Sequence, residues 1–143
     1  MFLCLVVLEY VSSYAIFDMQ SYTAVYEIVI SSPGINRAMV KRTLELVRNR
    51  QLNGVNVKVL TLPYETYPES RIEITKELIT ELKQSGIDVR LKSDLHEHFA
   101  VIDRNIVWYG SINLLSKAKE EDSLMRVPSS EIADELLEIG FTR

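Results

Sequence analysis

Residues 96–113, HEHFAVIDRNIVWYGSIN, decide the fold because they hold two short apolar runs separated by a polar DRN triplet. The runs FAVI and IVWY are rich in β-branched and aromatic side chains, which favour strands, and the triplet is typical of a tight turn. An antiparallel hairpin is therefore expected here. The same stretch contains the only two histidines of the chain, His96 and His98, whose side chains would share one face of a strand.

Strand and helix patterns alternate upstream of this hairpin. The runs at 27–32 (EIVISS), 55–62 (VNVKVLTL) and 87–92 (IDVRLK) predict strands. The two segments between them, 37–52 and 70–85, carry apolar residues at helical spacing. This order is typical of a parallel sheet whose strands are joined by helices.

The ends of these helices have their own signals. Asn36 is a suitable N-cap for the first helix, and Gly54 and Gly86 follow the two helices as stops. The remaining expected elements are a core strand at 1–8, a short helix at 17–27, a strand at 122–127 broken by Pro128, and a last helix that begins after a cap at Ser129 or Ser130. We therefore expect a single α/β domain over residues 1–143, with a mixed β-sheet flanked by helices.

Length and composition fit one such domain. A chain of 143 residues with 47% hydrophobic content can bury a core without disulfides, and the single cysteine, Cys4, cannot form one within the chain. For this reason we expect a cytoplasmic protein. The apolar opening at 1–8 is too short to span a bilayer, and a remnant of a signal or anchor segment is the alternative to a core strand there.

The charge of the chain is unevenly distributed. A net charge of -4 argues against a domain that coats nucleic acid with an overall positive field. The segment 37–58, however, holds six basic residues and one acidic residue. A solvated helix face and a surface that contacts phosphate backbones are both consistent with this basic segment.

The histidine pair first suggests a metal site, because two imidazoles on one face of a strand can chelate and Asp94 or Asp103 could add an oxygen ligand. Catalytic zinc usually takes three protein ligands, and the chain has no third histidine and no HExxH or CxxC motif. These counts favour a site without metal.

The histidines are also part of a longer pattern, which resembles the signature of the phospholipase D superfamily. That signature reads H-x-K-x-x-x-x-D, then six residues, then G-S-x-N. The matching residues are His96, Asp103, Gly110, Ser111 and Asn113. One position departs, because His98 stands where the family has lysine. The following stretch, GSINLLSKAKEEDSLMRV, is also similar to phospholipase D-like domains appended to DNA and RNA helicases.

The resemblance implies a role for each residue at the centre of the motif. His96 would be the nucleophile that forms a phosphohistidine, and Asn113 would bind the phosphate together with His98. Ser111 would donate to the phosphate or hold the turn, and Gly110 would let the backbone approach the substrate. No cofactor is implied.

Two acidic positions are implied as supporting residues. Asp103 would be structural and would fix the hairpin next to the site. An acid after the motif commonly orients the nucleophile in this family, and Asp122 is the first choice for it, with Glu121 next.

One motif supplies only half of such a site, so the resemblance implies a homodimer that brings two His96 side chains to one phosphate. We expect a phosphodiesterase that acts on nucleic acid rather than on lipid. The alternative is a catalytically impaired module for nucleic-acid binding or dimerisation, within a helicase-like protein. The lysine-to-histidine departure keeps both interpretations open, because an imidazole ordinarily titrates near pH 6.5, whereas lysine is charged at neutral pH.

Overall fold

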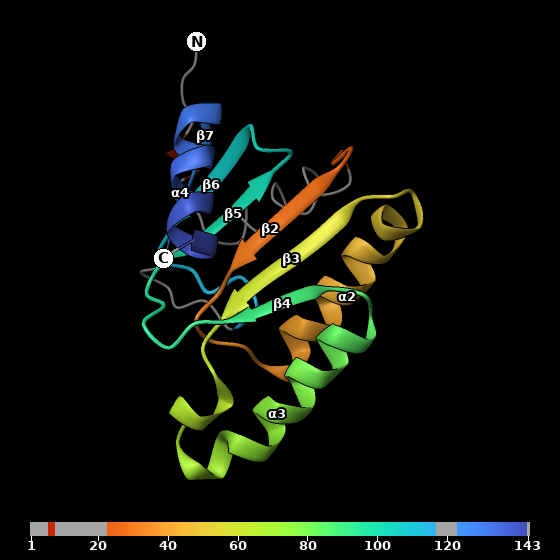
Figure 1. The fold of residues 1–143 in the computed structure, drawn as a ribbon, viewed down its shortest axis with the longest axis vertical. Coiled ribbons are helices and arrows are strands. Elements are labelled where there is room, and N and C mark those ends of the chain that lie inside the picture. The colour runs from red at the N-terminus through yellow and green to blue at the C-terminus, as the bar shows by residue number, and fades with distance from the viewer. Residues whose placement is uncertain (1–5, 8–22, 117–122, 143) are drawn as a thin grey trace.

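A mixed β-sheet with helices on both faces forms the centre of the molecule (Figure 1). The structure, a computed structural model, describes residues 6–7, 23–116 and 123–142. The strands of this part of the chain are β1 (Val6–Val7), β2 (Glu27–Ser31), β3 (Asn56–Thr61), β4 (Asp88–Leu91), β5 (His98–Ile102), β6 (Ile106–Gly110) and β7 (Leu124–Pro128). Its helices are α2 (Arg37–Leu52), the 3-10 turn η1 (Tyr64–Thr66), α3 (Glu69–Gln84) and α4 (Ser130–Thr142).

Strand order shows how the two parts of the sheet are joined. Among the described residues the order is β1-β7-β6-β5-β2-β3-β4. Strands β2, β3 and β4 are parallel and are connected by α2 and α3, whereas every other neighbouring pair is antiparallel. Strand β2 pairs in parallel with β3 on one side and antiparallel with β5 on the other. It is therefore the strand at which the parallel and antiparallel parts of the sheet meet.

The alternation of side chains along the strands builds two apolar layers. Ile28 and Ile30 of β2 join the core beneath α2 and α3, and Val29 between them joins the core beneath α4. All three are fully buried. Trp108 of β6 lies in the first core, whereas the next residue, Tyr109, is exposed.

Local signals begin and end the helices as the sequence predicts. The Asn36 side chain accepts a hydrogen bond from the Met39 amide at 2.9 Å, and Gly54 follows α2 with a φ of 87°. At α4 the Ser129 hydroxyl accepts from the Ile132 amide at 3.1 Å, which makes Ser129 the N-cap. The expected α/β fold, with βαβαβ followed by a hairpin and a C-terminal helix, is confirmed.

The hairpin turn consists of the DRN triplet, because Ile102 pairs with Ile106. Asp103 and Arg104 have φ values of 52° and 55°, and the Asn105 amide donates to the Ile102 carbonyl at 3.0 Å. Two central residues with positive φ define a type I′ turn, whose twist matches that of the strands it joins. Asn105 therefore closes the turn and is not one of its central residues.

Some expected elements differ or lie outside the described residues. Of the short helix expected at 17–27, residues 23–26 are not helical and 17–22 lie outside. Only Val6–Val7 of the first expected strand is described, and it pairs with β7. Pro128 is the last residue of β7 rather than a break before its end. Within the described ranges there is no helix long and apolar enough to span a membrane.

Candidate active site

The candidate site lies at the edge of the sheet where β2, β3, β4 and β6 end and β5 begins (Figure 1). Ser31 at the end of β2 pairs with Phe99, so the start of β5 lies beside the end of β2. His98 pairs with Gly110 across β5 and β6. The motif therefore has two halves, one with His96 and His98 and the other with residues 110–113, and these halves meet at one edge of the sheet. Open α/β sheets commonly bind ligands beyond the carboxyl ends of their parallel strands.

Buried apolar residues hold the polar residues of the motif at the surface. Leu95 is 2% exposed and anchors the segment before His96, whose own side chain is exposed. Ile112 and Leu114 are also buried, on either side of the half-buried Asn113. Apolar burial on this scale makes the backbone at both halves of the motif part of the packed core.

The amide of Asn113 has a defined orientation. Its Oδ1 accepts a hydrogen bond from the Gly34 backbone N–H at 2.9 Å. A backbone N–H can only donate, so the oxygen of the amide must face Gly34. The NH2 group is then the part of Asn113 that can donate to a phosphate oxygen. The turn at Ser32-Pro33-Gly34, which follows β2, is the partner that orients it.

Ser111 and Gly110 contact the chain at the start of β7. The Ser111 hydroxyl accepts from the Ser123 amide at 3.2 Å, and the Ser111 amide donates to the Ser123 carbonyl at 3.0 Å. A Cβ added at Gly110 would overlap with that same Ser123 carbonyl oxygen. Of the two roles expected for Ser111, these contacts favour holding the turn. They also give a structural reason for a glycine at position 110, which the sequence alone did not reveal. Whether either residue contacts phosphate stays a prediction.

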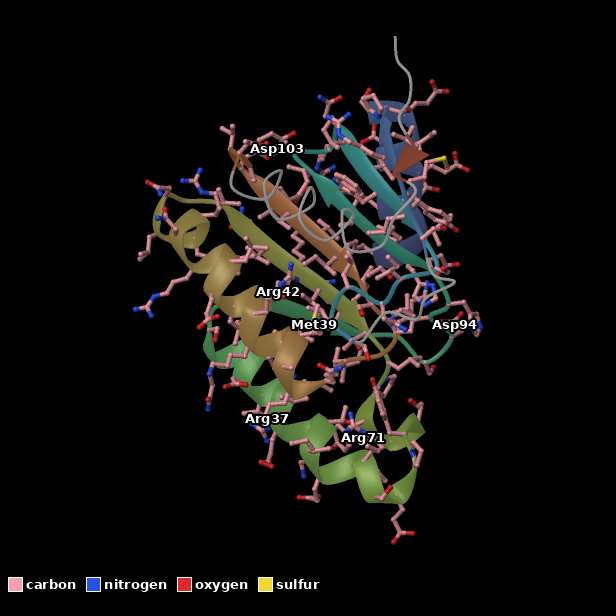
Figure 2. All side chains as sticks on the ribbon, turned by 180° about the vertical axis from the view of Figure 1, so that it is seen from behind. Arg37, Met39, Arg42, Arg71, Asp94 and Asp103 are labelled. Atoms are coloured by element: carbon pink, nitrogen blue, oxygen red, sulfur yellow. The ribbon has the colours of Figure 1, made fainter. Side chains whose placement is uncertain are left out.

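Asp103 lies away from the other residues of the motif. It follows the last residue of β5, and four strand steps of about 3.3 Å each separate that residue from His98. Figure 2 shows Asp103 at the end of the sheet opposite the loop that carries Asp94. The expectation that Asp103 fixes the hairpin next to the site is therefore wrong in its location, although its contacts are structural.

Three backbone amides bind the carboxylate of Asp103. They belong to Val25, Tyr26 and Glu27, at 2.8, 2.8 and 2.9 Å. The Tyr26 hydroxyl also donates to the Asp103 carbonyl oxygen at 2.7 Å. The turn between β5 and β6 thereby fixes the start of β2. The other acidic positions expected to assist, Asp122 and Glu121, lie outside the described residues.

Tyr67 is hydrogen-bonded to the loop after β2, which orients Asn113 through Gly34. Its hydroxyl donates to the Pro33 carbonyl at 3.0 Å and accepts from the Ile35 amide at 3.2 Å. Burial raises the pKa of the Tyr67 hydroxyl, and the hydrogen bond from Ile35 partly offsets that effect. Tyr64, three residues earlier, packs against the core, and its ring lies 5.5 Å from the Lys76 ammonium. Both tyrosines thus have intramolecular contacts.

The basic segment at 37–58 is not one continuous surface. Arg50 donates to the Ala24 carbonyl at 3.2 Å, and Lys58 pairs with the buried Glu27 at 3.5 Å. Arg37 and Lys41 are exposed on α2. Only part of the basic segment is therefore open to a phosphate backbone.

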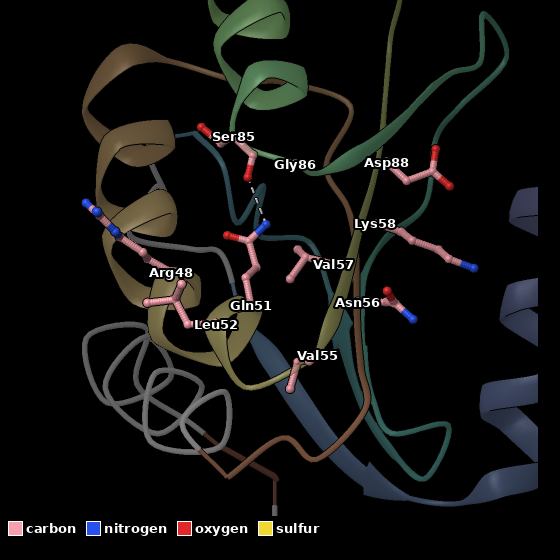
Figure 3. Close-up of a pocket in the computed structure, with 11 residues that line it drawn as sticks. Arg48, Gln51, Leu52, Val55, Asn56, Val57, Lys58, Ser85, Gly86 and Asp88 are labelled. Atoms are coloured by element: carbon pink, nitrogen blue, oxygen red, sulfur yellow. Dashed lines mark hydrogen bonds between the residues drawn. The ribbon is translucent and has the colours of Figure 1, made fainter.

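A pocket of about 690 Å³ lies at the opposite end of the parallel strands (Figure 3). Asn56 and Asp88, the first residues of β3 and β4, line it, and Gln51 donates across it to the Ser85 carbonyl at 3.0 Å. No residue of the motif is among its lining residues. In the part of the chain that the structure describes, no group of three or more His, Cys, Asp or Glu side chains could hold a metal ion.

Comparison with solved structures supports the fold. The phospholipase D family member Nuc from Salmonella typhimurium superposes with a TM-score of 0.70 and 18% identity, over 90% of this chain and 84% of that one. NucT from Helicobacter pylori gives a TM-score of 0.64 and 16% identity, over 92% and 85%. The archaeal chromatin protein TrmBL2 gives 0.64 and 14%, over 94% of this chain and 49% of that one.

Comparison of the sequence with curated proteins found no significant match. A family model does match, however, and its description is "Cardiolipin synthase, PLD-like domain". The match covers residues 20–139, which include both halves of the motif and all of the parallel strands. The chain belongs to the phospholipase D-like domain family.

Proposed function

We propose that the protein is a metal-independent phosphodiesterase that acts on nucleic acid through a phosphohistidine, as a homodimer. One observation carries this proposal. The pairing of His98 with Gly110 brings an exposed His96 and an oriented Asn113 amide to the same edge of the sheet. A nucleophile and a hydrogen-bond donor at one edge are what an anionic phosphodiester requires.

The reaction takes two steps. The His96 imidazole attacks phosphorus, an N–P bond forms, and the P–O bond to the leaving group breaks. His96 of a second copy gives its proton to the leaving oxygen. Water then attacks the phosphohistidine, the N–P bond breaks, and the proton lost by water returns to the second imidazole. Throughout, the Asn113 NH2 group and His98 donate to the non-bridging oxygens.

The homodimer follows from the number of histidines. The chain has two, and they are adjacent members of one motif, so a second His96 must come from a second copy. A twofold axis that passes through the phosphate would place the two nucleophile positions on opposite sides of it.

Nucleic acid is the proposed substrate for two reasons. TrmBL2, which has the same fold over 94% of this chain, is described as binding DNA. The exposed Arg37 and Lys41 on α2 provide positive charge that could contact neighbouring phosphates of a polynucleotide.

The second candidate is a module that binds nucleic acid or dimerises without catalysis, as part of a helicase-like protein. The observation that favours it is His98 in place of lysine, because an ordinary imidazole is mostly neutral at pH 7 and is then a weaker phosphate ligand than the charged lysine ammonium. Either candidate uses the same edge of the sheet.

Cleavage of bis(p-nitrophenyl) phosphate and of single-stranded DNA, both with excess chelator, tests the proposal. We expect turnover by wild type and none by His96→Ala. Asp94→Ala, an exposed residue of the same loop, is the matched control and should keep wild-type turnover. Activity that survives in His96→Ala would overturn the nucleophile assignment, and the absence of any wild-type turnover alongside retained DNA binding would favour the second candidate.

A further inference from the structure

We infer that two adjacent serines, Ser31 and Ser32, hold the two halves of the motif in register and act as positioning residues. Ser31 is the last residue of β2, and Ser32 follows it. Both are fully buried, with exposed fractions of 0%. This inference rests on the proposed function for its catalytic consequence, but its structural consequence can be measured without activity.

Ser31 holds the half that carries the histidines. Its hydroxyl donates to the carbonyl oxygen of Glu97 at 2.7 Å. Glu97 is the residue between His96 and His98, and the hydrogen bond falls just before the β2–β5 ladder begins at Phe99. The peptide that links the two histidines is therefore tied to the sheet at a point where the ladder itself does not reach.

Ser32 holds the half that carries the asparagine. Its hydroxyl donates to the Gly34 carbonyl at 2.7 Å and accepts from the Leu115 amide at 3.1 Å. It also lies 3.4 Å from the Asn113 Oδ1. A second link, from the Asn36 amide to the Leu115 carbonyl at 2.8 Å, joins the same two loops. The Gly34 amide that orients Asn113 is thus fixed by contacts to the turn that carries Asn113.

The position of the serines, at the last residue of β2 and the residue after it, explains how one dipeptide can serve both halves. Successive side chains of a strand point to opposite faces, so Ser31 and Ser32 can each reach a different segment. Strand β2 lies between β5 and β3, inside the sheet. A hydroxyl buried there is costly unless it is hydrogen-bonded, and each of these two has a partner in the motif or in its supporting loop. The packed sheet then fixes the distance between the imidazoles and the Asn113 amide.

The kinetic test compares Ser31→Ala and Ser32→Ala with wild type on bis(p-nitrophenyl) phosphate. We expect kcat to fall about tenfold to a hundredfold in each variant with KM changed by about twofold at most, because misplacement of a catalytic group affects the transition state more than substrate binding. Thr75→Val is the matched control. Thr75 is also fully buried, but its hydroxyl has no hydrogen-bond partner among the described residues, so this variant should keep the wild-type kcat.

A second measurement is independent of turnover. The {1H}-15N heteronuclear NOE of the Asn113 side-chain NH2, assigned through its loss in Asn113→Asp, reports the order of the amide. We expect a clear decrease in Ser32→Ala, whereas Ser31→Ala should shift the imidazole resonances of His96 and His98 and leave the Asn113 NOE unchanged. If Ser32→Ala does not fold, Ser32→Cys keeps the shape with a weaker donor and should show an intermediate decrease.

Wild-type NOE and imidazole resonances in both alanine variants would overturn the inference. Altered resonances in a protein whose wild type has no turnover would overturn the proposed function and leave the positioning roles supported. A proportional loss of kcat in Thr75→Val would show that general destabilisation, rather than positioning, causes the effect.

Discussion

The two ends of β5 carry polar residues of the same motif that serve opposite purposes. At the Asp103 end, three backbone amides occupy the carboxylate, and the carbonyl oxygen of the same residue accepts from Tyr26. At the His98 end, His96 is exposed, and the hydrogen bonds of the Asn113 amide to the described residues involve its oxygen, which accepts from the Gly34 amide. One motif therefore combines a structural anchor with residues available to a ligand. The hydrogen bonds of each residue, rather than its membership of the motif, indicate whether its role is structural or functional.

The largest expected effect is at the available end. His96→Ala should lower phosphodiester turnover by about a thousandfold or more, because removal of a nucleophile stops the covalent route. Its free energy of unfolding should change by about 0.5 kcal/mol at most, because the side chain is exposed. Steady-state kinetics and urea denaturation of the same preparation check both values. A loss of stability of several kcal/mol would remove the contrast between the two ends.

The next effect is at the structural end, where we expect a loss of stability with little change in turnover. Asp103→Ala should lower the free energy of unfolding by about 2 kcal/mol, because three backbone amides, one of them on the buried Glu27, lose a charged acceptor and alanine disfavours the positive φ of this position. The kcat of the folded fraction should stay near that of wild type. Asp103→Asn keeps one acceptor oxygen and tolerates positive φ, so we expect a smaller loss. A large decrease in kcat without loss of stability would instead place Asp103 in the catalytic machinery.

The residue that departs from the family signature gives an intermediate effect. His98→Lys should raise turnover at pH 8 by about tenfold, because a permanently charged ammonium replaces an imidazole that is mostly neutral there. The gain should shrink toward pH 5.5, where an ordinary imidazole is charged. A pH-rate profile of the two proteins measures this difference. No gain at any pH would favour the second candidate, a binding module without catalysis.

Local patterns in the sequence predict the fold and fail to predict how its distant parts meet. The bounds of α2 and its cap at Asn36 follow from helical periodicity and from one side chain that bonds three residues ahead. The contacts of Asp103 do not, because its carboxylate binds amides 76 to 78 residues earlier in the chain. The same holds for Gly110, whose lack of a side chain is required by the carbonyl of Ser123, the residue before the neighbouring strand β7. Ser31 and Ser32 look like an ordinary strand end in the sequence, since their partners lie 66 and 83 residues away.

The smallest expected effect concerns Tyr67, whose hydroxyl is hydrogen-bonded to the loop that orients Asn113. Because burial raises the pKa of Tyr67, folding favours its neutral hydroxyl, which donates to Pro33. Above the ordinary tyrosine pKa of about 10, the unfolded chain loses this proton while the folded protein keeps it. The stability contributed by the group is therefore fully present below pH 10 and is lost as pH rises toward the folded-state pKa.

Tyr67→Phe should lower the free energy of unfolding by about 1 kcal/mol at pH 7. Urea denaturation between pH 7 and pH 11 should then show a shallower alkaline decline for the variant than for wild type. Parallel declines would mean that Tyr67 does not contribute, and the loop that orients Asn113 would depend on Ser32 and Thr61 alone for its side-chain bonds to the Pro33 and Gly34 carbonyls.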